Sequence, residues 1–89
     1  MRWSAEKSLS LKAERDVSFE AVLSAIAQGG LITVLSHPNR SKYGHQRILV
    51  VAIRDYANLV PFVESENEIF LKSIMPSRKA TRDYLFGDK

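Results

Sequence analysis

The sequence predicts an α+β domain: two N-terminal helices, a four-stranded antiparallel β-sheet meander and a short C-terminal helix, with the helices on one face of a twisted sheet. Three observations lead to this fold class. Apolar residues recur at helical spacing over residues 19–26, and four extended aliphatic segments follow over residues 31–75. Pro76-Ser77 then opens a final polar segment with the features of a helix start.

The first helix is expected over residues 4–15, with Ser4 as its N-cap. One stripe of apolar side chains at i, i+4 and i+8 is the expected buried face. It consists of Ala5, Leu9 and Ala13. Leu11 falls off that stripe, and the order Leu9, Leu11, Ala13 also fits the alternation of a strand.

The second helix is expected to begin after Ser18, a good N-cap, with Val17 and Val22 at the spacing of a hydrophobic staple. Gln28-Gly29-Gly30 should end it, because glycine adopts the left-handed C-cap conformation without a side-chain penalty. The predicted buried face consists of Phe19, Val22, Leu23 and Ile26.

Strands are expected over four segments, and the last helix over residues 77–84 with Ser77 as N-cap. Arg54-Asp55 is short enough to require a hairpin, although this pair is not the preferred composition for its turn. Pro61 cannot donate to a ladder, so a bulge or an unpaired flank is expected there. The four strand segments are 31–36, 47–53, 56–63 and 68–75.

Length and composition restrict the class of protein. The 89 residues suit a single domain, 1–89, and the absence of cysteine excludes disulfides and thiolate zinc sites. No apolar stretch resembles a signal peptide or approaches the roughly 20 residues of a membrane helix. We therefore expect a cytoplasmic protein that has no contact with membranes.

The net charge of +3 is unevenly distributed. Segments 36–47 and 76–82 together carry six basic residues and no acid, which leaves seven basic and ten acidic residues elsewhere. If folding brings the two segments together, they create a positive field suited to phosphates. The six cations are Arg40, Lys42, Arg47, Arg78, Lys79 and Arg82.

Arg78 and Lys79 occupy the first helical positions, where the helix dipole disfavours cations. A local rule broken twice in succession points to a functional role, here an anion site for a phosphodiester. Arg82 lies one turn further on the same face. The alternative is that all three are ordinary solvated surface cations.

Segment 36–47 contains both histidines, His37 and His45, together with Tyr43. RNA cleavage by 2′-hydroxyl attack needs a proton acceptor, charge stabilisation and help for the leaving 5′-oxygen, which such groups can supply. Tyr43 could also stack on an unpaired base. The alternative is a solvated connection in which His37-Pro38 sets the end of a strand.

Other chemistries find little support. Glu64, Glu66 and Glu68 alternate around a hairpin without paired histidines, so they indicate a solvated turn rather than a metal site. No glycine-rich phosphate loop or nucleophile elbow is present. The sequence predicts no metal and no cofactor.

Several segments resemble BrnT-like toxins of the RelE/ParE superfamily. They are Val17-Ser18-Phe19-Glu20, the ending from Ile74 to Tyr84, His37-Pro38-Asn39 and Val60-Pro61-Phe62-Val63. The order of elements is similar over nearly the whole chain. The resemblance implies the toxin of a type II toxin–antitoxin system. It also implies an antitoxin partner, which is often a ribbon-helix-helix protein. The toxin itself would then contact operator DNA only through this antitoxin.

The resemblance further implies a metal-independent endoribonuclease that inhibits translation, with functional cations at Arg47, Arg78 and Lys79. Lys42, Arg82 and Tyr84 match less closely. With the loop residues, the candidate catalytic set is Arg47, Arg78, Lys79, His37 and His45, and the candidate RNA-binding set is Arg40, Lys42, Tyr43, Arg82 and Tyr84.

This sequence lacks the acid-rich loop before the second strand that is usual in the family, and its last helix is short. The superfamily also contains gyrase poisons and inactive proteins. A non-catalytic binding module, acting as a gyrase-type poison or a partner-dependent regulator, is therefore the alternative function.

Overall fold

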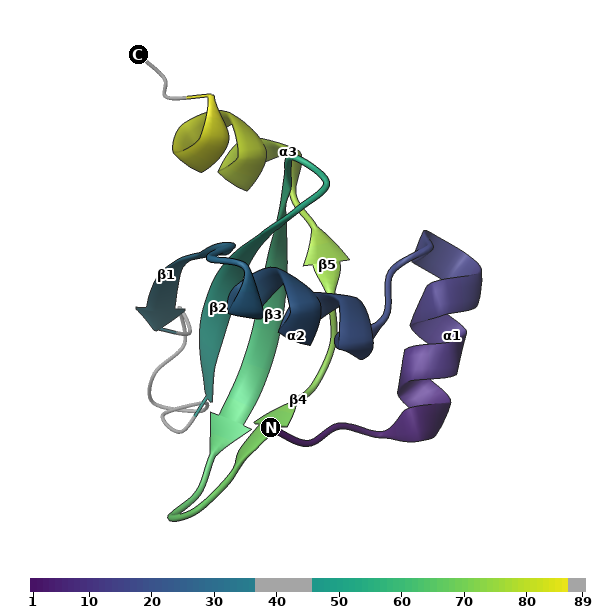
Figure 1. The fold of residues 1–89 in the computed structure, drawn as a ribbon. Helices are drawn as coiled ribbons and strands as arrows, with labels where there is room; N and C mark the ends of the chain where they lie inside the picture. The colour runs from purple at the N-terminus through teal and green to yellow at the C-terminus, as the bar shows by residue number, and fades with distance from the viewer. Residues whose placement is uncertain (37–45, 87–89) are drawn as a thin grey trace.

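The predicted α+β fold is confirmed by the computed structural model, which describes residues 1–36 and 46–86. Two helices precede an antiparallel sheet whose strands β1 to β4 are neighbours in chain order, and a short helical segment ends the chain (Figure 1). A fifth, two-residue strand, β5 (Met75–Pro76), pairs with β3 on the side that β4 also occupies. Within the described residues, no helix is long and apolar enough to cross a membrane.

Helix α1 (Ala5–Arg15) begins at Ser4 as predicted, but it buries a different face. The expected stripe of Ala5, Leu9 and Ala13 faces solvent, and Leu9 is 73% exposed. Ser8 and Leu11 are buried instead. The prediction was wrong because the inward face includes a serine, which finds hydrogen-bond partners on the next helix, and apolar periodicity does not detect such a residue.

Helix α2 (Phe19–Ala27) begins and ends where the sequence predicts. The Ser18 side chain accepts a hydrogen bond from the N–H of Ala21, and Val17 and Val22 are both buried. Gly29 has φ +88°, the left-handed conformation expected of a C-cap glycine. A Cβ at Gly30 would lie 2.8 Å from the carbonyl oxygens of both Ala25 and Ala52, so only glycine allows α2 to approach β2 this closely.

The sheet is built around a long central hairpin. β2 (Gln46–Ile53) and β3 (Tyr56–Glu64) pair along their whole length, and β1 (Leu31–Ser36) lies on the outer side of β2. Arg54 and Asp55 connect β2 to β3 with φ of 55° and 63°, as in the type I′ turn of two-residue hairpins. The turn thus takes its usual geometry without the glycine or asparagine that usually supplies it.

The predicted strand over 68–75 is divided into β4 (Ile69–Leu71) and β5. Phe62 pairs with Leu71 and Leu59 pairs with Met75, so the three residues 72–74 lie opposite the two residues 60–61. This bulge confirms the irregularity expected at Pro61, which has no N–H to donate. The carbonyl oxygen of Pro61 still accepts a hydrogen bond from the N–H of Lys72 over 2.8 Å.

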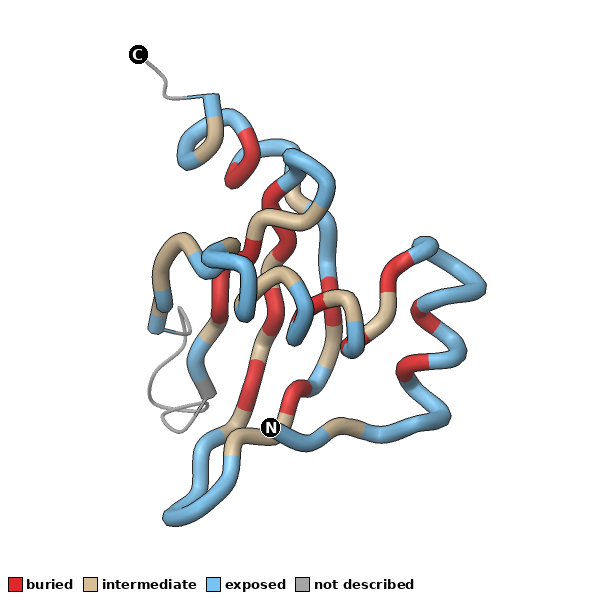
Figure 2. The backbone as a smooth tube through the Cα atoms, viewed as in Figure 1, coloured by how far each residue is buried: buried red, intermediate tan, exposed pale blue. Residues whose placement is uncertain are grey.

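The two faces of the sheet carry different helices. Leu49 and Val51 of β2 pack with residues of α1 and α2, whereas Val50 between them packs with Ala80 of the C-terminal segment. Because successive side chains of a strand point to opposite faces, the last helix lies on the face away from α1 and α2. The expectation that all helices share one face was therefore wrong. Figure 2 shows the buried residues concentrated along β2 and β3 between these layers.

Candidate functional site

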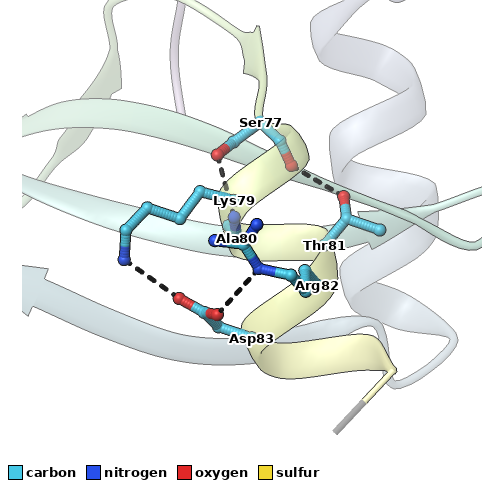
Figure 3. Close-up of polar contacts among 6 residues, drawn as sticks. All are labelled: Ser77, Lys79, Ala80, Thr81, Arg82 and Asp83. Atoms are coloured by element: carbon cyan, nitrogen blue, oxygen red, sulfur yellow. Dashed lines mark hydrogen bonds and ion pairs between the residues drawn. The ribbon is translucent and has the colours of Figure 1, made fainter. Parts of the chain in front are cut away.

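The C-terminal segment (residues 77–86) carries most of the described candidate residues. It consists of one turn of α-helix, α3 (Arg78–Ala80), followed by a π-helical turn, η1 (Thr81–Leu85). The side chain of Ser77 caps α3 by accepting a hydrogen bond from the N–H of Ala80 over 3.0 Å (Figure 3). The predicted N-cap is confirmed, and the wider π turn closes through the N–H of Phe86 and the carbonyl of Thr81. Such π turns are frequent at functional sites.

Thr81 and the backbone of Ser77 attach this segment to the sheet, since the N–H of Ser77 donates to the carbonyl of Ala57 over 2.9 Å. The hydroxyl of Thr81 donates to the carbonyl of Ser77 over 2.7 Å and accepts from the N–H of Ala57, in β3, over 2.8 Å. Thr81 is only 4% exposed, and Ala80 beside it packs on Val50 and Ala57. The segment is therefore fixed on the sheet through its inner side, and its outer side is left to charged residues.

Three cations and one acid occupy that outer side. Nζ of Lys79 lies 3.1 Å from one carboxylate oxygen of Asp83, and Nε of Arg82 lies 3.6 Å from the other (Figure 3). The hydrogen bond from Lys79 lowers the pKa of Asp83 below its ordinary value. Arg78 forms no ion pair within the part of the chain that the structure describes. The cluster of Arg78, Lys79, Arg82 and Asp83 carries a net charge of +2 at an exposed surface.

A small pocket of about 190 Å³ adjoins this cluster. Its lining includes the apolar side chains of Leu59 in β3 and Leu35 in β1, together with Lys79 and Asp83 of the cluster. Tyr84 also lines the pocket and is 42% exposed. An aromatic ring next to apolar side chains and cations is a combination that can hold a nucleobase beside its phosphate.

Arg47 lies apart from this cluster. Its guanidinium group is stacked over the ring of Phe62, with Cζ 5.5 Å from the ring centroid, and it forms an ion pair with Glu64. Phe62 belongs to the core under α1 and α2, so Arg47 is on the face opposite to the C-terminal segment. Arg47 is also far along the strand from the place where the C-terminal segment is attached. Ala57 hydrogen-bonds to Thr81 and pairs with Ala52 of β2, and Arg47 precedes Ala52 by five residues, or about 17 Å of strand. The structure does not bring Arg47 together with Arg78 and Lys79.

The other candidates of segment 36–47 lie outside the described residues. They are His37, Arg40, Lys42, Tyr43 and His45. The flanks of that segment are described: Ser36 ends β1 and pairs with Arg47. Leu35, the neighbour of Ser36, lines the pocket beside Tyr84.

Two acids contribute to the electrostatics of the candidate residues and were not among the predicted site residues. Asp83 is the partner of both Lys79 and Arg82, and the i, i+4 spacing of Lys79 and Asp83 could have indicated it. Glu64, expected to belong to a solvated turn, is the partner of Arg47. Because Gln46 pairs with Val63, the next residues along the two strands, Arg47 and Glu64, lie close together. Nothing in the sequence fixes that register.

The chain matches no family model, no curated protein and no solved structure.

Proposed function

We propose that this protein is the toxin of a type II toxin–antitoxin system, and that it is an endoribonuclease which inhibits translation in the cytoplasm. The observation that carries this proposal is the exposed cluster of Arg78, Lys79 and Arg82 on a segment fixed to the sheet by Thr81. Tyr84 and the apolar pocket beside the cluster add a place for an unpaired base.

The ion pairs of the cluster support binding of a phosphodiester. Lys79, Arg82 and Asp83 are all at the surface, where such pairs contribute little to stability because water screens them. A phosphate can therefore replace the carboxylate of Asp83 as the partner of these cations at low cost. In RNA cleavage the same cations would stabilise the additional negative charge that develops on phosphorus as the 2′-oxygen attacks.

The proton acceptor is a separate requirement. Asp83 is a weak base near neutral pH, because the hydrogen bond from Lys79 lowers its pKa. The histidines His37 and His45 keep their place as candidates for the base, and both are outside the described residues.

The test compares RNA cleavage by the wild-type protein, the double variant Arg78→Ala, Lys79→Ala, and a control variant Lys7→Ala, Lys12→Ala. The control removes the same charge from the exposed surface of α1, which packs on the other face of the sheet. We expect cleavage by the wild type and the control, and loss of cleavage in the Arg78, Lys79 variant. Equal cleavage by all three proteins, or none by the wild type, would contradict the assignment.

A second candidate function is a non-catalytic binding module, such as a gyrase-type poison or a partner-dependent regulator. It is favoured by the position of Arg47, which is paired with Glu64 on the face away from the C-terminal segment. Expression in cells separates the two functions, because a ribonuclease halts translation and a gyrase poison provokes a DNA-damage response. A neighbouring reading frame for a small ribbon-helix-helix protein would support the toxin assignment.

A further inference from the structure

The strand β1 forms an open edge of the sheet. It lies at the end of the strand order, and its described backbone groups hydrogen-bond only on the side of β2. Its sequence, Leu-Ile-Thr-Val-Leu-Ser, contains no charged residue and no proline. Soluble proteins usually protect such edges with charges, proline or a covering segment, because an open edge pairs readily with another strand.

The opposite edge is protected. Arg2 forms a bridge to β4, in which its N–H donates to the carbonyl of Ile69 and its carbonyl accepts from the N–H of Leu71, both over 2.8 Å. Beyond the bulge, β5 is two residues long and includes Pro76, which has no N–H. In the part of the chain that the structure describes, β1 is thus the long edge that is free to pair.

The described residues also leave the α2 side of β1 partly exposed. Helix α2 packs mainly on β2 and does not extend over β1, the outer strand (Figure 1). Leu31 and Val34 pair with Val51 and Leu49, whose side chains point to that face, and they are 41% and 42% exposed. A strand added at β1 would cover apolar side chains as well as backbone groups.

We propose that a second copy of this chain occupies this edge, so that the protein is a two-fold dimer with β1 antiparallel to β1 of its partner. An uncharged apolar strand meets its own copy without repulsion. Since β1 is the one long open edge among the described residues, pairing of two copies uses both such edges and stops, which gives a closed dimer rather than a filament. In the antiparallel arrangement, the two Ser36 ends of β1, each paired with an Arg47 of β2, lie at opposite ends of the interface. The two Arg47 side chains are therefore kept apart.

Sheet geometry restricts the register. A two-fold axis perpendicular to the sheet keeps the α2 face of both copies on the same side. Each residue of β1 must therefore lie opposite a residue of the partner strand whose side chain points to the same face of the sheet. The strand has an irregularity between Leu31 and Thr33, and the regular part that follows runs from Thr33 to Ser36. Val34 is the residue of its middle whose side chain lies on the exposed α2 face. We therefore place Val34 opposite its own copy, with Thr33 opposite Leu35.

The first experiment measures molar mass in solution over a series of concentrations for the wild type, Val34→Lys and Leu9→Lys. Leu9 is the control, since it is an exposed leucine on the outer side of α1. We expect twice the chain mass of 10.1 kDa for the wild type and for Leu9→Lys, and the single mass for Val34→Lys. A monomeric wild type, masses that keep growing with concentration, or a Val34→Lys dimer would overturn the proposal.

The second experiment does not depend on the folding of the lysine variant. The chain has no cysteine, so Val34→Cys introduces a single thiol, with Leu9→Cys as the control. Directly opposed residues of antiparallel strands are close enough for a disulfide with little adjustment. Mild oxidation should link Val34→Cys into a covalent dimer and leave Leu9→Cys largely unlinked. Equal linking of the two variants would overturn the placement of Val34. A monomeric wild type that instead binds a different protein would overturn the assignment of a second copy to this edge.

Discussion

The hydroxyl of Ser8, in the middle of α1, accepts a hydrogen bond from the backbone N–H of Phe19, the first residue of α2, over 3.2 Å. The same hydroxyl donates to a carboxylate oxygen of Glu20 over 3.0 Å. The first N–H groups of a helix have no partner within the helix, so Ser8 supplies one from the neighbouring helix. This contact orients α1 against the start of α2, and it explains why a serine rather than the apolar stripe faces the core.

Replacing Ser8 with alanine should lower the free energy of unfolding by about 1–2 kcal/mol, because the buried N–H of Phe19 loses its acceptor. Urea unfolding of Ser8→Ala and of Ser10→Ala measures the difference. Ser10 is exposed on the same helix, so its replacement tests the change of side chain without the contact. Equal stability of the two variants would show that the contact contributes nothing.

The stability of the fold should fall in acid partly through Glu20. Its own backbone N–H and then the Ser8 hydroxyl donate to the carboxylate, and they lower its pKa below the ordinary value of 4.5. With a folded pKa below the unfolded one, the unfolded chain binds the proton more readily. The contribution of Glu20 is therefore complete above the unfolded pKa and is lost as the pH falls through the folded pKa.

Unfolding midpoints measured from neutral pH down through this range should decline less steeply for Glu20→Gln than for the wild type. Part of the decline should persist, since ion pairs with Lys12 and Arg54 lower the pKa of Asp16 in the same direction. Ser8→Ala should give an intermediate slope because it removes one of the donors to Glu20 and leaves the others in place. An unchanged slope in Glu20→Gln would refute the assignment.

The elements that follow local rules could be predicted from the sequence. Ser4, Ser18 and Ser77 each accept a hydrogen bond at the start of a helix, as their side chains and positions indicate. The irregularity opposite Pro61 was predictable because the missing N–H of proline is a local property. In all these cases the determining interaction lies within a few residues or in the residue itself.

Features that depend on distant contacts could not be predicted. The inward face of α1 is decided by the partners of Ser8 on another helix, and the face on which the last helix lies is decided by Thr81 and Ala57. For the candidate site, charge patterning identified Arg78, Lys79 and Arg82 as one exposed cluster. It could not show that Arg47 points to the other face, because the alternation of β2 relative to the core depends on strand register.

Thr81→Val should lower the free energy of unfolding by about 1–3 kcal/mol, because the buried N–H of Ala57 then has no acceptor. Thr81→Ser keeps the hydroxyl and should lose less. Urea unfolding measures both variants, and amide exchange at Ala57 should accelerate in Thr81→Val alone. If the two variants are equally destabilised, the methyl group rather than the hydroxyl holds the segment in place.

The hairpin turn offers a stabilising substitution. Asp55 has φ +63°, a conformation that glycine adopts without steric cost. Asp55→Gly should therefore raise the free energy of unfolding by about 0.5–1 kcal/mol, the usual size of such a relief after the added flexibility of the unfolded chain is subtracted. Asp55→Ala should lower it, because alanine has a Cβ and lacks a polar side chain to hydrogen-bond locally. Thermal unfolding of the two variants should shift in opposite directions.

The separation of Arg47 from the C-terminal cluster predicts how RNA binding responds to salt. Each phosphate neutralised by a cation adds about 0.7 to the slope of log affinity against log salt concentration for single strands. If Arg78, Lys79 and Arg82 each contact a phosphate, replacing all three with alanine should reduce the slope by about 2. Arg47→Ala should leave it unchanged, since Arg47 is stacked on Phe62 and paired with Glu64 on the other face.

Fluorescence anisotropy of a labelled single-stranded RNA, titrated at several salt concentrations, measures these slopes. Arg47→Ala must first give the circular dichroism spectrum of the wild type, because the stacking on Phe62 also covers part of the core. A slope that falls as much in Arg47→Ala as in Arg78→Ala would mean that RNA contacts both faces of the sheet. In that case the phosphate path would have to pass around the end of the sheet where Ser36 pairs with Arg47. An unchanged slope confines the RNA to the face on which the C-terminal segment packs.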